Sequence, residues 1–194
     1  MSADLQFFFE AKAAGEFKHV DAQKVRRMND ELGAGDLVIL ICGDCKHSRD
    51  QIGRLFTTFQ SMDPHLLALN GGPLKADGIC NVKNAGYAQD EILEALEAKP
   101  HIGQVLLINH YPCAIAAKAK MGVRDQIVSQ LTVKRRLRER IGVRTPAVKI
   151  GLLYHVFYEG QTPEEARRMY YFCNDGMQKY LNATIDQRLK IGAA

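Results

Sequence analysis

The chain has 194 residues, of which 46% are hydrophobic and 25% charged, and its formal net charge is +4. These values are ordinary for a soluble globular protein with one buried core. No apolar run approaches the roughly 18 residues of a membrane span, and the first residues lack the basic start and apolar core of a secretory signal. We therefore expect a cytoplasmic protein whose five cysteines are thiols or metal ligands rather than disulfides.

Four short apolar runs predict buried strands. The first three are almost continuously apolar, as in strands covered on both faces of a sheet. The four runs span residues 37–41, 66–69, 105–108 and 148–157.

Helical patterns lie between and after these runs. Ser48 is a good capping residue, and apolar residues then recur at helical spacing as far as residue 59. Two further helices are expected around residues 92–96 and over residues 124–140. Thr162, followed by a proline and two acids, predicts the start of a last helix, whose apolar side would include Met169 and Tyr170.

The alternation of strands and helices predicts an α/β fold, with a mostly parallel central sheet of four to five strands flanked by helices. We expect a single domain with three parts: an N-terminal helical arm over residues 1–32, a core over residues 36–161 and a C-terminal helix over residues 162–194.

One stretch of the third helix is strongly basic. It would suit phosphate or nucleic acid, but no interleaved aromatic residues or nucleic-acid motif accompany it, so a solvated helix face or part of a subunit interface is favoured. The residues are Lys134, Arg135, Arg136, Arg138 and Arg140.

Two cysteine-containing motifs follow predicted parallel strands. Cys42 opens the run CGDCK directly after the first strand, and His110 and Cys113 follow the third strand in the run NHYPC. The carboxyl ends of parallel strands meet at one edge of a sheet, where ligands of such folds bind. Thiolate and imidazole are preferred zinc ligands. Cys42, His110 and Cys113 are therefore predicted to bind one zinc ion.

The residues alone leave several alternatives open. Water, Asp44 or Cys45 could complete the zinc coordination, and Cys45 would give a closed structural site. Cys42 and Cys45 could instead form a redox-active pair, because C-x-x-C between a strand and a helix is typical of thiol oxidoreductases. His110 and Cys113 could also be ordinary core residues.

The order of the motifs resembles the β-class carbonic anhydrase family over residues 36–161. The matching features are C-x-D-x-(R/K) from Cys42 to Lys46, a glycine turn at Gly71 and Gly72 after the next strand, and H-x-x-C from His110. The chain differs from that family's usual pattern in having Lys46 in place of arginine and an additional thiol, Cys45.

The resemblance implies an enzyme that reversibly hydrates CO2 to bicarbonate with a zinc-bound hydroxide, using Cys42, His110 and Cys113 as zinc ligands. It implies that Asp44 lies beside the open zinc position; Lys46 would then hold Asp44 ionised. The turn at Gly71 and Gly72 could approach the substrate, or could serve only as a tight turn.

Related functions are hydrolysis of COS or CS2, or a non-catalytic zinc protein closed by Cys45. The resemblance also implies a homodimer or homotetramer. Phe7, Phe8 and Phe9 near the N-terminus support this weakly, because their rings would need to be covered, for example by a partner subunit. No nucleic-acid or membrane partner is expected.

Overall fold

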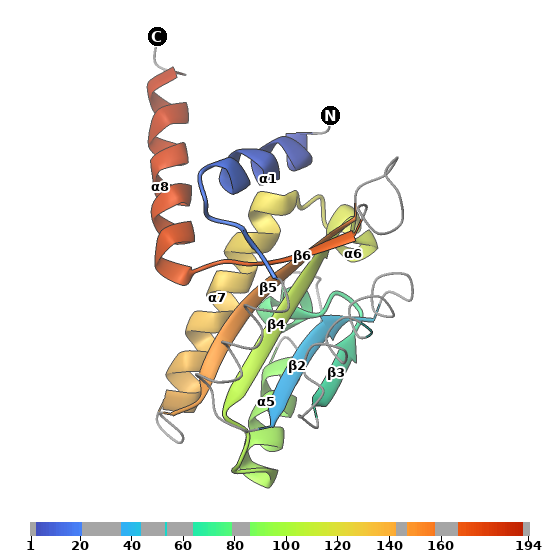
Figure 1. The fold of residues 1–194 in the computed structure, drawn as a ribbon. Helices are drawn as coiled ribbons and strands as arrows, with labels where there is room; N and C mark the ends of the chain where they lie inside the picture. Colours follow the sequence, from blue (N-terminus) through green and yellow to red (C-terminus); the bar gives the residue numbers. More distant parts are fainter. Residues whose placement is uncertain are drawn as a thin grey trace.

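A six-stranded sheet forms the centre of the molecule, which we describe from a computed structural model (Figure 1). The strand order across the sheet is β1-β6-β5-β4-β2-β3. The four neighbouring strands β5, β4, β2 and β3 run parallel to one another. β6 runs antiparallel to β5, and β1 runs antiparallel to β6. The strands are β1 (Lys18–His19), β2 (Leu37–Cys42), β3 (His65–Leu69), β4 (Gln104–Tyr111), β5 (Lys149–Phe157) and β6 (Arg167–Tyr171).

Helices connect and flank these strands. α5 and α7 lie behind the sheet in the view of Figure 1. α8, the last helix before the C-terminus of the chain, stands beside the sheet. The helices are α1 (Ala3–Ala13), α4 (Pro73–Asp77), α5 (Tyr87–Ala98), α6 (Ala114–Lys118), α7 (Val123–Gly142) and α8 (Asn174–Ile191). The structure describes residues 3–20, 36–43, 53, 64–78, 86–142, 147–157 and 167–191.

The predicted fold class is confirmed as a mixed α/β fold with a mostly parallel sheet flanked by helices, and the sheet has six strands rather than four or five. All four predicted strands are present, as are the helices expected around residues 92–96 and 124–140. The helix expected from Ser48 to residue 59 lies outside the described residues apart from Gly53.

Both faces of the parallel strands are buried, which explains their continuous apolar sequence. Every residue of β2 is buried. Val38 and Leu40 belong to the large core that also includes side chains of α1, α5 and α7. Ile39 and Ile41 point to the opposite face, where they cluster with Leu106 and Ile108 of β4.

The prediction of a continuous C-terminal helix is wrong for residues 167–171, which form strand β6. Met169 packs in the core on one face of the sheet and Tyr170 in the core on the other face. Two adjacent apolar residues fit a helix as well as a strand buried on both faces, and pairing with β5 selects the strand. Helix α8 begins only at Asn174, and Thr162 lies outside the described residues.

The N-terminal segment is not a purely helical arm, because Lys18 and His19 form a sheet strand after α1. Phe7 and Phe8 are 7% and 0% exposed within the chain itself, whereas Phe9 is 37% exposed. The expectation that these rings together require cover from another subunit is therefore wrong for Phe7 and Phe8.

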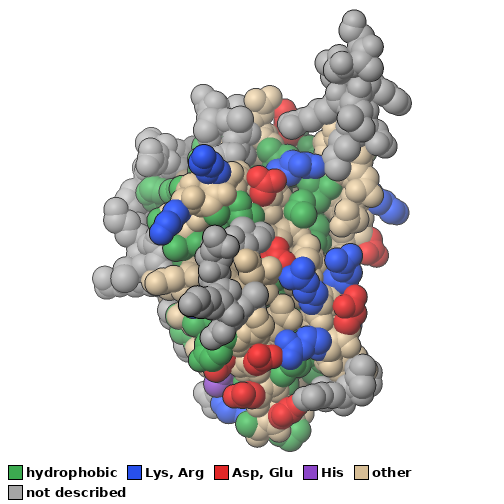
Figure 2. Space-filling view, turned by 180° about the vertical axis from the view of Figure 1, so that it is seen from behind, with side chains coloured by type: hydrophobic (Ala, Val, Ile, Leu, Met, Phe, Trp, Pro, Cys, Tyr) green, Lys and Arg blue, Asp and Glu red, His purple; other side chains and the backbone are tan. Residues whose placement is uncertain are grey.

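Acidic side chains neutralise part of the basic stretch of α7. Arg136 forms a 2.7 Å ion pair with Asp77 of α4, and Arg140 forms a 2.6 Å ion pair with Asp90 of α5. In Figure 2, which shows the molecule from behind, lysine and arginine side chains lie among aspartates and glutamates. For Arg136 and Arg140, these ion pairs support the interpretation as a solvated helix face.

None of the described helices is both long enough and apolar enough to cross a bilayer.

Candidate metal centre

The order of the strands reverses at the carboxyl ends of β2 and β4. The chain passes from β2 to β3 on one side, and then to β4 on the other side of β2. Ligands of open α/β sheets bind outside the strand ends where such a reversal occurs. Cys42 is the last residue of β2, His110 lies near the end of β4, and Cys113 immediately precedes α6.

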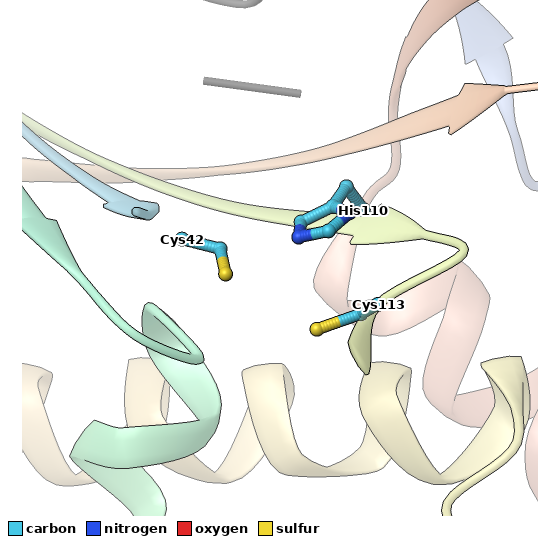
Figure 3. A group of neighbouring side chains, drawn as sticks. All are labelled: Cys42, His110 and Cys113. Atoms are coloured by element: carbon cyan, nitrogen blue, oxygen red, sulfur yellow. The ribbon is translucent and has the colours of Figure 1, made fainter. Parts of the chain in front are cut away.

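Cys42, His110 and Cys113 come together at this switch point of the sheet. Their two sulfur atoms and a ring nitrogen all lie within 4.8 Å of one another, and the three residues are 3%, 1% and 6% exposed. Figure 3 shows the side chains converging from the end of β2, from β4 and from the start of α6. The three residues predicted as ligands are thus placed so that they could hold a metal ion.

The donor set fits a zinc ion in its chemistry and in its dimensions. Zinc binds sulfur at about 2.3 Å and imidazole nitrogen at about 2.0 Å, so tetrahedral ligands stand about 3.5–3.8 Å apart. The separations within this cluster reach that range with a contraction of about 1.3 Å or less. Two thiolates and one imidazole leave one tetrahedral position for another ligand.

A glycine turn supports the first ligand from the side of β3. The Gly71 N–H donates a hydrogen bond to the Cys42 sulfur at 3.2 Å. Gly72 has a φ of +49°, and a Cβ on it would stand 2.6 Å from the Cys42 backbone nitrogen. The Gly43 and Gly72 N–H groups both donate to the Leu69 carbonyl, at 3.0 and 2.7 Å. Only a residue without a side chain fits at position 72, so the turn is held tightly against the end of β2.

The two thiols of the cluster are strongly coupled. The pKa of Cys42 is lowered chiefly by a hydrogen bond with Cys113, with further help from His110 and the Gly71 N–H, although burial opposes the change. The pKa of Cys113 is raised, because the Cys42 thiolate accepts its proton in a hydrogen bond and because the site is buried. Near neutral pH the metal-free pair is therefore expected to share one proton between its two sulfur atoms.

Apolar side chains surround the cluster. Leu74 of α4 and Ala116 of α6 are 1% exposed and form one buried cluster with the two cysteines, and the partly buried Ile115 and Met121 pack against it. A metal held here would lie in surroundings of low polarity, where charge interactions are stronger than in water. Sequence reasoning missed this cover and the Gly71 hydrogen bond, since both depend on how α4 and α6 fold back on the strand ends.

The remaining predicted site residues have different outcomes. Gly71 and Gly72 lie at the centre as predicted, and the structure gives them a backbone role beside Cys42. Their contact with a substrate stays a prediction. Asp44, Cys45 and Lys46 lie outside the described residues, so the fourth metal position and the redox pair also stay predictions.

Comparison of the chain with protein-family models, with curated proteins and with solved structures finds no significant match.

Proposed function

We propose that this protein is a zinc-dependent carbonic anhydrase that reversibly hydrates CO2 to bicarbonate. The buried cluster of Cys42, His110 and Cys113 at the switch point of the sheet is the observation that supports this most. The resemblance of the motif order to the β-class family points to the same three residues. COS or CS2 hydrolysis would use the same centre.

Zinc is the metal that this donor set suits best. Thiolates exclude the hard cations magnesium and calcium, and a tetrahedral site of two thiolates and an imidazole is typical of zinc. When bound in a site with an open position, zinc acidifies a coordinated water so that it can attack carbon near neutral pH.

The chain's own residues would prepare this chemistry. The Gly71 N–H draws charge from the Cys42 thiolate, which lessens the charge that the sulfur donates to a bound cation. Leu74 and Ala116 keep one side of the centre apolar, which suits an uncharged substrate such as CO2. In the proposal Asp44 accepts a hydrogen bond at the open position and Lys46 keeps Asp44 ionised, as the resemblance implies.

Stopped-flow measurement of CO2 hydration on protein carrying one zinc per chain tests the proposal. We expect a rate well above that of buffer at pH 8.5, and we expect Cys113→Ser to abolish both the rate and stoichiometric zinc. Cys173→Ser is the matched control, because Cys173 is exposed and lies outside the cluster. A zinc-loaded protein with no rate above buffer would refute the carbonic anhydrase proposal.

A further inference from the structure

A second candidate site lies between α7 and the first turn of α8, away from the cysteine cluster. A cavity of about 590 Å³ opens there, lined by the α7 side chains Lys134, Arg135 and Arg138 and by residues at the start of α8. Pockets that bind small molecules commonly measure about 300–1,000 Å³. Its size therefore suits an organic molecule rather than a bare ion.

The charges around this cavity are unevenly distributed. Lys134 is half-buried, whereas the acids Glu139 and Asp175 at the same cavity are exposed to solvent. Water screens exposed carboxylates strongly, so they compensate a deeper cation poorly. The cavity thus has its least screened charge, a positive one, at the half-buried lysine.

The three cavity cations differ from the other basic residues of α7 in their partners. Arg136 and Arg140 pair with aspartates on α4 and α5. Within the part of the chain that the structure describes, Lys134 and Arg135 form no hydrogen bond or ion pair, and Arg138 donates to the Val148 carbonyl at 2.8 Å. Their donor capacity is therefore largely available to a ligand.

Burial lowers the pKa of Lys134, and the nearby Arg138 charge contributes to the same effect, whereas negative charge at Cys173 and Asp175 opposes the change without cancelling it. Burial and the Arg138 charge penalise the ammonium group in the absence of a ligand, and an anion placed beside it would offset both.

Apolar surface adjoins these cations. Val128, one turn before Thr132 on α7, lines the cavity and is 41% exposed, which is unusual among the large apolar residues described. Leu131 lines the cavity beside it. A ligand that joins an anionic head to an apolar body would match both parts of the lining.

We propose that the cavity between α7 and α8 binds a small organic oxyanion, with Lys134, Arg135 and Arg138 holding the anionic group and Val128 and Leu131 contacting its apolar part. This site is separate from the metal centre, and its occupancy does not depend on the proposed reaction. The amino end of α8, an 18-residue helix, lies at the same cavity and adds a favourable dipole.

Titration of the zinc-loaded full chain with phenyl phosphate, followed by backbone amide NMR shifts, tests the proposal. We expect saturable shifts in residues of α7 and in the first turn of α8, weaker binding of inorganic phosphate, and no binding of the neutral analogue benzyl alcohol. Lys134→Gln should weaken phenyl phosphate binding by about tenfold or more, because it removes a charged donor. Lys179→Gln is the matched control, since it removes the same charge from α8 outside the cavity.

Equal effects of Lys134→Gln and Lys179→Gln would show only general charge attraction and overturn the proposal. Shifts confined to the residues around Cys42 and Cys113, or the absence of saturable shifts, would overturn it as well. If Lys134→Gln lowers the unfolding temperature appreciably, Arg135→Gln on the exposed side of the cavity replaces it, with the same expected loss.

Discussion

At the scale of single residues, Gly72 is the position where the metal centre depends most strictly on a missing side chain. Its φ of +49° disfavours any L-residue, and an added Cβ would lie 2.6 Å from the Cys42 nitrogen and 2.7 Å from the Ile41 carbonyl carbon. Because those atoms are backbone of a buried strand, they cannot move aside cheaply.

We therefore predict that Gly72→Ala lowers the free energy of unfolding by about 2 kcal/mol or more and weakens zinc binding. Gly142→Ala at the end of α7 is the matched control, because its Cβ would meet no atom within 4 Å. Urea unfolding of both variants measures the difference. Equal stabilities would contradict the tight packing of the turn on β2.

The protonation of the two thiols leads to a second prediction at this scale. The pKa of Cys42 is lowered and that of Cys113 raised, so near neutral pH the metal-free pair shares one proton. Zinc binds thiolates, so binding must expel that proton.

Calorimetry in buffers of different ionisation enthalpy should thus show about one proton released from the thiol pair per zinc at about pH 8. Zinc affinity should fall as the pH is lowered, since protons then compete for both sulfurs. A water bound to the zinc could add one proton to this count. Release of three protons, or of none, would therefore contradict the shared-proton description of Cys42 and Cys113.

At the scale of elements, α1 is anchored by one buried ring. Phe8 is fully buried and stands 4.8 Å from Phe17, 5.1 Å from Tyr170 and 6.5 Å from Tyr154, measured between ring centroids. The helix, the N-terminal strand segment and two sheet strands therefore meet at this side chain.

Phe8→Ala should cost about 3–5 kcal/mol of stability, because it leaves a cavity in this aromatic cluster. The neighbouring Phe9→Ala should cost about 1 kcal/mol or less, since its ring is partly exposed. Thermal unfolding of the two variants provides the test. A cost for Phe9→Ala as large as that for Phe8→Ala would show instead that its ring is buried in the protein in solution, as in a subunit contact.

The elements predicted correctly from the sequence are those whose hydrophobic pattern fits only one type of secondary structure. The apolar run at residues 37–41 is too short for a helix and too apolar for an exposed strand, so it could be assigned correctly to β2. Met169 and Tyr170 fit two periodicities, and only their pairing with Tyr154 and His155 of β5 decides for a strand. That pairing is long-range and leaves no local signal.

The same reasoning applies to the candidate site. Cys42, His110 and Cys113 could be predicted together because the carboxyl ends of parallel strands meet at one edge. The Gly71 hydrogen bond to Cys42 could not, because it depends on the path of the turn after β3. The cover from Leu74 and Ala116 depends likewise on two short helices of five residues each, which carry little sequence periodicity.

At the scale of the whole molecule, one arrangement explains the position of the metal centre. The sheet order places β3 and β4 on opposite sides of β2, so the order of the strands reverses at β2, where Cys42 is the last residue. Leu74 of α4 and Ala116 of α6 pack beside the cysteines there. We propose that this position holds one zinc ion with an exchangeable fourth ligand.

X-ray absorption spectroscopy of the zinc-loaded protein tests that claim most directly. We expect two sulfur ligands at about 2.3 Å and two nitrogen or oxygen ligands at about 2.0–2.1 Å around one zinc per chain. A shell of three sulfurs and one nitrogen, which Cys45 would complete, would contradict it. So would one zinc per chain retained in the Cys113→Ser variant.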